Sequence, residues 1–295
     1  MKKTIYTHQR ESQFKTMLLM TSFLGLVIGL GYVISQIIGD PGILYIFIAI
    51  SIFMNIGAYW FSDKIVLRMT HAKPAARDDN PQLYNLVQNL AITAGLPMPK
   101  LYILEDRVPN AFATGRNKDS AVVAVSTGLL RIMDKAELEG VVAHELAHIG
   151  NKDMLVSTMA VILAGFVSIV ADWFMRASMF CGNDSRGNNG LAIVVGIVIA
   201  ILAPLFASLL RLAVSRRREF LADASAALLT RYPEGLESAL EKLGKYSGKM
   251  QHAHKTTAHL FIATPFGKAA KRMGHIFSTH PPIGERVRRL REMGQ

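Results

Sequence analysis

The stretch DKAELEGVVAHELAHIGN, residues 134–151, decides how the rest of this chain is organised. Asp134 stands before a run with helical spacing, and Glu137 three residues later completes the pattern of a capping box. Gly150-Asn151 is suited to ending the helix, just before a long apolar segment. We therefore expect one helix from Asp134 to about Ile149, apolar almost all round.

His144 and His148 are four residues apart and so share one face of that helix. Both imidazoles can reach one tetrahedral zinc ion at ~2.0–2.1 Å. Zinc lowers the pKa of a bound water toward about 7, and Glu145 is placed to take the proton of such a water. Two ordinary helix histidines are the alternative, but these polar groups would be costly on an apolar helix unless ligated or paired. The pattern therefore predicts a catalytic zinc site.

Catalytic zinc normally has three protein ligands and an open position. The single cysteine, Cys181, excludes a thiolate cluster and an internal disulfide. Glu219 and Asp223 are again four apart, on an apolar, Ala-rich segment. We interpret Glu219 as the third ligand and Asp223 as the acceptor for the free N–H of a ligand histidine. A solvated Glu219 beside an arginine cluster is the alternative, and a His/His/Glu set leaves cobalt or manganese open.

His280 precedes Pro281-Pro282, which fix the backbone at the entrance of a helix. A histidine held in this way is suited to donating a hydrogen bond to an oxyanion, and Arg286 could assist with its charge. A surface histidine in a turn fits the same spacing. The other histidines match no metal motif and stay unassigned: His8, His71, His252, His254, His259 and His275.

The composition indicates a membrane protein, because 51% of the residues are hydrophobic and only 19% are charged. A helix that crosses a bilayer needs about 20 apolar residues. Four segments approach that length, at about 17–38, 43–61, 154–179 and 191–214. The tight turn at 39–42 and the polar loop at 181–190 make them two transmembrane hairpins.

Two of these segments have a second reading. The third contains Asp172 and Arg176, so it also fits a long amphipathic helix on the membrane surface. The first follows a basic N-terminal region and could be a signal peptide, but it is longer than an apolar signal region of about 7–15 residues. We therefore expect a retained anchor.

Basic residues set the expected orientation. Of the 33 Lys and Arg residues, four precede the first span, 11 lie in 62–153 and 16 lie in 211–295, whereas the two hairpin loops hold only Arg186. The positive-inside rule then places both termini and both polar regions in the cytoplasm. The net charge of +11 is explained by basic segments beside anionic lipid headgroups rather than by nucleic-acid binding.

We expect a mainly α protein with a small β-sheet and four membrane spans. The expected domains are the hairpin 1–61, the first cytoplasmic half 62–153, the hairpin 154–214 and the second half 215–295. Strands are expected at 100–104 and 121–125, and helices at 80–91, 215–229, 233–246 and 283–293. The helix at 215–229 is expected to continue the fourth span.

Taken together, these residues resemble the HtpX-type membrane proteases, which are related to the CAAX prenyl endoproteases. The resemblance rests on the following pieces: His144–His148, Glu219–Asp223, His280-Pro281-Pro282 with Arg286, the segment Pro109–Gly115, and the order of the spans. It covers nearly the whole chain.

The resemblance implies a gluzincin-like zinc endopeptidase with one Zn²⁺ per chain, a general base Glu145 and an oxyanion-stabilising His280. It also implies that substrate backbone adds to a strand edge formed by Asn110, Ala111, Phe112 and Ala113. The expected substrates are misfolded or damaged membrane proteins at the cytoplasmic face of the cell membrane. A prenyl-protein endoprotease and a non-enzymatic membrane protein that keeps a structural zinc site are the alternatives.

Overall fold

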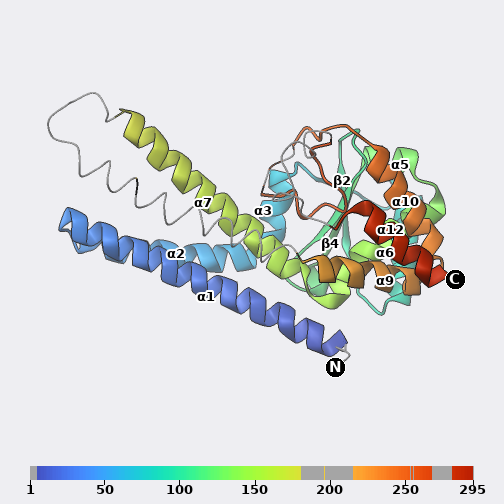
Figure 1. The fold of residues 1–295 in the computed structure, drawn as a ribbon, viewed down its shortest axis with the longest axis horizontal. Helices are drawn as coiled ribbons and strands as arrows, with labels where there is room; N and C mark the ends of the chain where they lie inside the picture. Colours follow the sequence, from blue (N-terminus) through green and yellow to red (C-terminus); the bar gives the residue numbers. More distant parts are fainter. Residues whose placement is uncertain are drawn as a thin grey trace.

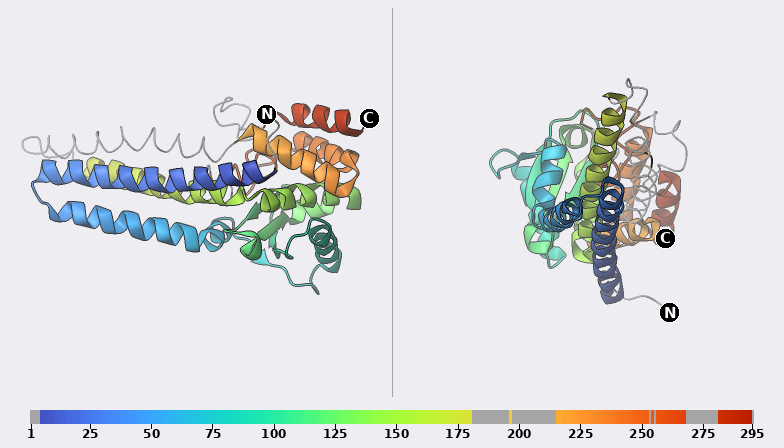
Figure 2. Two further views of the ribbon diagram at one scale, coloured as in Figure 1. Left: turned by 90° about the horizontal axis from the view of Figure 1, so that it is seen from below. Right: turned by 90° about the vertical axis from the view of Figure 1, so that its left-hand side faces the viewer.

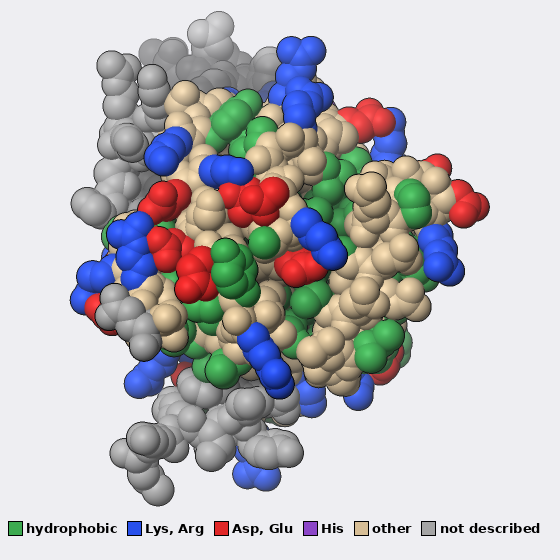
Figure 3. Space-filling model, turned by 90° about the vertical axis from the view of Figure 1, so that its right-hand side faces the viewer, with side chains coloured by type: hydrophobic (Ala, Val, Ile, Leu, Met, Phe, Trp, Pro, Cys, Tyr) green, Lys and Arg blue, Asp and Glu red, His purple; other side chains and the backbone are tan. Residues whose placement is uncertain are grey.

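The computed structural model describes residues 5–180, 196, 215–252, 254, 256–267 and 281–294. Three long helices project from one side of a rounded mixed α/β domain (Figure 1). The end of the domain that faces away from these helices carries basic and acidic side chains interspersed (Figure 3), as is usual for a surface in water.

The projecting helices are α1 (Ile5–Ile38), α2 (Gly42–Trp60) and α7 (Met154–Phe180). Two helical stretches, Arg10–Ile38 and Gly42–Trp60, are long and apolar enough to cross a membrane, and the bent pair α6–α7 offers a third. Helices are thus present where the first predicted hairpin and the third segment were expected. The predicted fourth span at 191–214 and the loop at 181–190 lie outside the described residues.

The three helices pack together through apolar side chains. Phe23 of α1 is fully buried and meets Phe166 of α7 edge to face, with ring centroids 6.0 Å apart. The left view in Figure 2 shows α1 and α2 running in opposite directions, and the two helices are in contact. Gly39 makes the turn between them with a φ of 78°, and the Asp40 carboxylate accepts the Gly42 N–H at 2.8 Å to start α2.

The domain contains a four-stranded sheet in the order β1-β2-β4-β3. The strands are β1 (Lys73–Pro74), β2 (Lys100–Leu104), β3 (Ala111–Thr114) and β4 (Val122–Ser126). β2 and β4 are parallel, β1 is antiparallel to β2, and β3 is antiparallel to β4. The two predicted strands are confirmed, and β3 forms one edge of the sheet.

Helices cover both faces of the sheet. They are α3 (Ser62–Met69), α4 (Pro81–Thr93), α5 (Thr127–Ile132), α6 (Lys135–Asn151), α9 (Arg216–Thr230), α10 (Pro233–Lys245) and α12 (Ile283–Gly294); a short 3-10 turn, η1 (Lys118–Ser120), precedes β4. Ala113 and Val123 face the core with α4, α6 and α9, whereas Phe112 and Ala124 face α3 and the start of α7. This alternation follows the period of two in a strand.

α6 is fixed at its first turn before it reaches the site. The capping box is present: Asp134 accepts the Glu137 N–H at 2.9 Å, and Glu137 accepts the Asp134 N–H at 2.9 Å. The nearly buried Glu137 also accepts bonds from Lys242 and Ser238 of α10, each at 2.6 Å. Burial raises the pKa of Glu137, but these bonds outweigh it and the pKa lies below the usual range. Glu137 therefore ties α6 to α10 as a carboxylate.

One predicted helix boundary is wrong. The sequence suggested that the helix at 215–229 continues a membrane span, but Ser215 has an extended backbone with φ −143° and ψ 107°. α9 begins afresh at Arg216. Helix α9 therefore starts at its own first turn after an extended residue, and it packs on α6.

Candidate metal centre and active site

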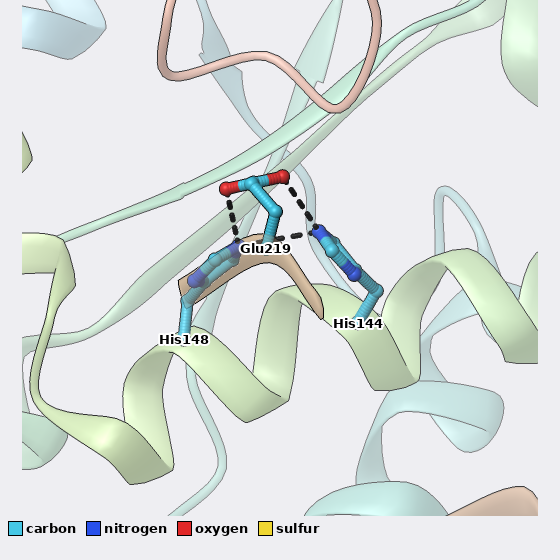
Figure 4. Close-up of side chains that lie close together, drawn as sticks. All are labelled: His144, His148 and Glu219. Carbon is cyan, nitrogen blue, oxygen red and sulfur yellow. Dashed lines mark hydrogen bonds and ion pairs between the residues drawn. The ribbon is translucent and has the colours of Figure 1, made fainter. Parts of the chain in front are cut away.

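Two helices bring three ligand groups together. α6 supplies His144 and His148 from adjacent turns, and α9, which packs across α6, supplies Glu219. Their side chains converge on one point (Figure 4), and one ligand atom from each lies within 4.8 Å of the others. The three predicted metal ligands therefore meet, although 71 residues separate His148 from Glu219.

The spacing of the ligand atoms fits zinc. The Nε2 atoms of His144 and His148 are 3.2 Å apart, and the Glu219 carboxylate oxygens lie 3.7 Å from the first and 3.6 Å from the second. In a tetrahedral site with bonds of ~2.0–2.1 Å, ligand atoms are about 3.3–3.4 Å apart. The nitrogen and oxygen donors and their separations match that geometry.

Each ligand histidine has its own carboxylate partner. His144 directs Nδ1 to Asp223 Oδ1 at 2.9 Å, as predicted. His148 directs Nδ1 to Asp153, whose two oxygens lie at 3.1 and 3.2 Å. A proton held at Nδ1 leaves the Nε2 lone pair of each ring for a metal, so both carboxylates select the ligating tautomer.

The sequence reading missed Asp153, and the local backbone explains why. Lys152 ends α6 in the left-handed conformation with φ 56°, and the axis of α7 is bent 88° from that of α6. Asp153 stands at this corner, and its N–H meets the His148 carbonyl at 3.3 Å. Asp153 follows His148 by five residues. Residues five apart do not lie on the same face of a helix, so this spacing did not mark Asp153 as a partner of His148.

Substitution of Asp153 tests this contact. We expect Asp153→Asn to weaken zinc binding about 10- to 100-fold, because a neutral amide polarises the His148 ring less than a carboxylate does. Competition of the purified chain with a metal chelator measures the change. Asp119→Asn, at an exposed position in η1, is the matched control and should bind zinc as the unaltered chain does. Equal affinities for both variants would contradict the assignment.

Arg286 of α12 lies behind the ligands. Its side chain is fully buried; Nε donates to Asp223 Oδ2 at 2.9 Å and an Nη donates to Asp223 Oδ1 at 2.7 Å. Another Nη donates to the Ile262 carbonyl at 3.2 Å. Burial raises the pKa of Asp223, but Arg286 and His144 together hold it well below the usual range. The result is a continuous line of contacts from Arg286 through Asp223 to His144.

Negative groups dominate the centre. Burial lowers the pKa of His148, but Asp153, Glu219 and Glu145 raise it to about 10. Glu145 itself is 1% exposed, and burial raises its pKa above the usual range despite the opposing effect of the two histidines. A site that favours a cation so strongly is suited to a divalent metal, and a carboxylate with a raised pKa is suited to accepting a proton near neutral pH.

The other predicted site residues have different surroundings. Asn110 is fully buried, its amide donates to the Ala263 carbonyl at 2.8 Å, and Ala111 accepts the Ile262 N–H at 2.9 Å. Phe112 is also buried and meets Phe261 edge to face. His280 and His275 lie outside the described residues. Ring centroids of His71 and His252 are 4.0 Å apart, with no carboxylate completing a metal set among the residues described.

The fold and site define a class of protein. A helix with the His-Glu-x-x-His pattern, a third glutamate ligand from a second helix and a sheet edge beside them are the parts of a zinc metallopeptidase, here attached to membrane helices. A family profile described as peptidase family M48 matches residues 77–294. The chain belongs to this family, among its HtpX-type membrane metalloproteases.

Several relatives support this placement over the full length. A protease HtpX homolog from Syntrophobacter fumaroxidans is 45% identical over 96% of this chain and 99% of its own length. Another from Tropheryma whipplei is 42% identical over 98% of this chain and 99% of its own. The crystal structure of S. mikatae Ste24p is similar with a TM-score of 0.51 and 18% identity, over 97% of this chain and 67% of that one. The last similarity concerns the fold alone.

Proposed function

We propose that this enzyme cleaves misfolded or damaged membrane proteins at the cytoplasmic face of the membrane. The observation that carries this is the join between the zinc helix and a membrane helix. Only Lys152 and Asp153 separate α6 from α7, and Asp153 binds the ligand His148. This join supports a site near the membrane surface, where segments that emerge from the lipid could reach it.

The cytoplasmic placement rests on charge. The regions 62–153 and 211–295 hold 27 of the 33 basic residues, 11 and 16 respectively, and these regions contain the site. We propose that the chain is divided as the sequence predicts. A hairpin at 1–61 precedes a cytoplasmic protease domain whose halves are 62–153 and 215–295, and a second hairpin at 154–214 is inserted between them.

The mechanism assigns one task to each side chain. His144, His148 and Glu219 would hold the zinc ion, which when bound would supply a Lewis acid for water activation and carbonyl polarisation. Glu145 takes a proton from the attacking water as the oxygen bonds to the peptide carbon, and returns a proton to the amine nitrogen as the C–N bond breaks. Asp223 and Asp153 keep the histidine rings oriented.

The oxyanion of the tetrahedral intermediate requires hydrogen-bond donors or charge. We assign this to His280, because the two prolines that follow it restrain the backbone before α12. Arg286 is fully buried behind the ligands, where it binds Asp223 and has one Nη 3.4 Å from His144 Nδ1, so its contribution is one of positioning.

The backbone of the substrate is proposed to pair with β3. The register of β3 on β4 determines which β3 residues can offer their N–H and C=O groups to it. Ser126 N–H donates to the Asn110 carbonyl at 2.9 Å, so by alternation Phe112 also bonds toward β4, whereas Ala111 and Ala113 point away from it. The outward groups of Ala111 already bind Asn110 Oδ1 and the Ile262 N–H. Ala113 is therefore the residue of the predicted set that offers its N–H and C=O to a substrate strand.

Ala113→Pro tests that pairing. Proline removes an N–H that makes no bond to β4, so the sheet should stay intact while one substrate hydrogen bond is lost. We expect KM for a peptide substrate to rise about tenfold, the equivalent of one hydrogen bond of about 1 kcal/mol or slightly more. Ala113→Gly keeps the N–H and should leave KM nearly unchanged. If both variants bind substrate alike, with normal zinc content, pairing at Ala113 is refuted.

The substrate class is tested in proteoliposomes of the full-length enzyme. A membrane protein with a destabilised cytoplasmic region should be cut faster than its stable parent, and an inactive Glu145→Gln enzyme should cut neither. Equal cleavage of the two would oppose a role in quality control. A farnesylated peptide is the third substrate; if it were preferred to both, the prenyl-endoprotease alternative would replace the proposal.

A further inference from the structure

The end of α2 carries large aromatic side chains where a span would leave the bilayer. Trp60 is 58% exposed and Phe61 is 52% exposed, immediately before α3 turns into the domain. Exposed tryptophan next to a span is typical of the layer of lipid headgroups, where the ring meets lipid and its N–H meets water. This position marks the height of the headgroups on the molecule.

Two cations from separate parts of the chain lie on these rings. The guanidinium of Arg116 lies 4.1 Å from the Trp60 ring centroid and 5.5 Å from that of Tyr59. The ammonium of Lys64 lies 5.6 Å from the Phe61 ring centroid. Among the described residues neither cation pairs with a carboxylate, although Asp63 and Asp119 are near them in sequence.

The loop that carries Arg116 is held in one conformation by its own backbone and side-chain contacts. Gly115 has a φ of 140°, and a Cβ there would come within 2.7 Å of the Ser120 carbonyl oxygen. Asn117 Oδ1 accepts the Ser120 N–H at 2.9 Å and its hydroxyl at 2.8 Å. This closed loop follows β3 directly, so Arg116 is held against α2 before any ligand binds.

We propose that Arg116 and Lys64, with Trp60 and Phe61, form a binding site for the headgroup of an anionic phospholipid. A guanidinium held over an aromatic ring still has N–H groups that can bond to phosphate oxygens, and phosphate accepts such bonds in pairs. The acyl chains would lie along the exposed apolar face of α2, where Phe53 and Ile56 are exposed. The lipid would fix the loop after β3, and with it the sheet edge, at a set height above the bilayer.

The test measures lipid binding, not cleavage, so it does not depend on the proposed substrates. The full chain in detergent is titrated with phosphatidylglycerol and with phosphatidylcholine, and bound lipid is counted by native mass spectrometry. The altered protein carries Arg116→Gln with Lys64→Gln. The matched control carries Arg131→Gln with Lys135→Gln, two exposed cations on α5 and α6. Trp60→Leu is a third protein that keeps both charges, and zinc content reports that each is folded.

We expect the unaltered chain and the control to prefer phosphatidylglycerol by about tenfold or more, since each basic residue near the surface contributes about fivefold. The Arg116/Lys64 protein should lose that preference, and Trp60→Leu should lose part of it. An equal loss in the control pair would show an unspecific charge effect and overturn the proposal. Displacement of the lipid by millimolar inorganic phosphate would also overturn it, because the site would then recognise free phosphate rather than a lipid.

Discussion

Glu145→Gln is expected to reduce kcat for peptide cleavage by about 10²- to 10⁴-fold, the usual contribution of a general base. Glutamine has nearly the same shape but no lone pair basic enough to take a proton from water. The ligands His144, His148 and Glu219 are untouched, so zinc content should stay at the level of the unaltered chain. Cleavage rate and metal content measured on one preparation separate loss of the base from loss of the metal.

Glu139→Gln provides the control for this change. It makes the same chemical change on the same helix, but Glu139 is only partly buried and pairs loosely with the exposed Lys135, at 3.9 Å. We expect kcat to stay within about twofold for Glu139→Gln, as for surface changes that cost less than about 0.5 kcal/mol. Retained cleavage in Glu145→Gln would exclude Glu145 as the base, and lost zinc would show instead that this side chain supports the metal.

The part of the site that sequence could predict is the part built by local periodicity. His144, Glu145 and His148 lie within five consecutive residues, and one helix is enough to bring the two rings to one face. Glu219 and Asp223 repeat the same spacing on a second helix. Helix boundaries for α4, α6, α10 and α12 were also within a few residues, because capping residues and prolines mark them.

The parts that were missed depend on turns and long-range packing. Asp153 meets His148 only because Lys152 takes a left-handed conformation and the chain bends by 88°. Arg286 meets Asp223 across 63 residues, and Ile262 meets Ala111 across the domain. β1 has two residues, too few for any period to be read. No local pattern encodes these contacts, since each requires the assembled core.

Arg286→Met is expected to destabilise the domain by about 3–5 kcal/mol, the usual cost of leaving one member of a buried ion pair without its partner. The Arg286 side chain is fully buried. Without it, Asp223 would keep a buried negative charge beside the His144 ring. The midpoint of thermal unfolding should fall accordingly. Arg288→Met on the same helix is the control, because the Arg288 side chain is 65% exposed and bonds to the exposed Glu292.

A second measurement on the same proteins separates positioning from direct catalysis. If Arg286 acts by holding Asp223 against His144, Arg286→Met should weaken zinc binding as well, and adding Asp223→Asn should cost little more because the two side chains act as one unit. If Arg286 stabilised the oxyanion itself, kcat would fall while zinc affinity stayed unchanged. Nε and one Nη of Arg286 bond to Asp223 at 2.9 and 2.7 Å, that Nη also lies 3.4 Å from His144 Nδ1, and the other Nη bonds to the Ile262 carbonyl. All three donor nitrogens are thus engaged behind the ligands, so the first outcome is expected.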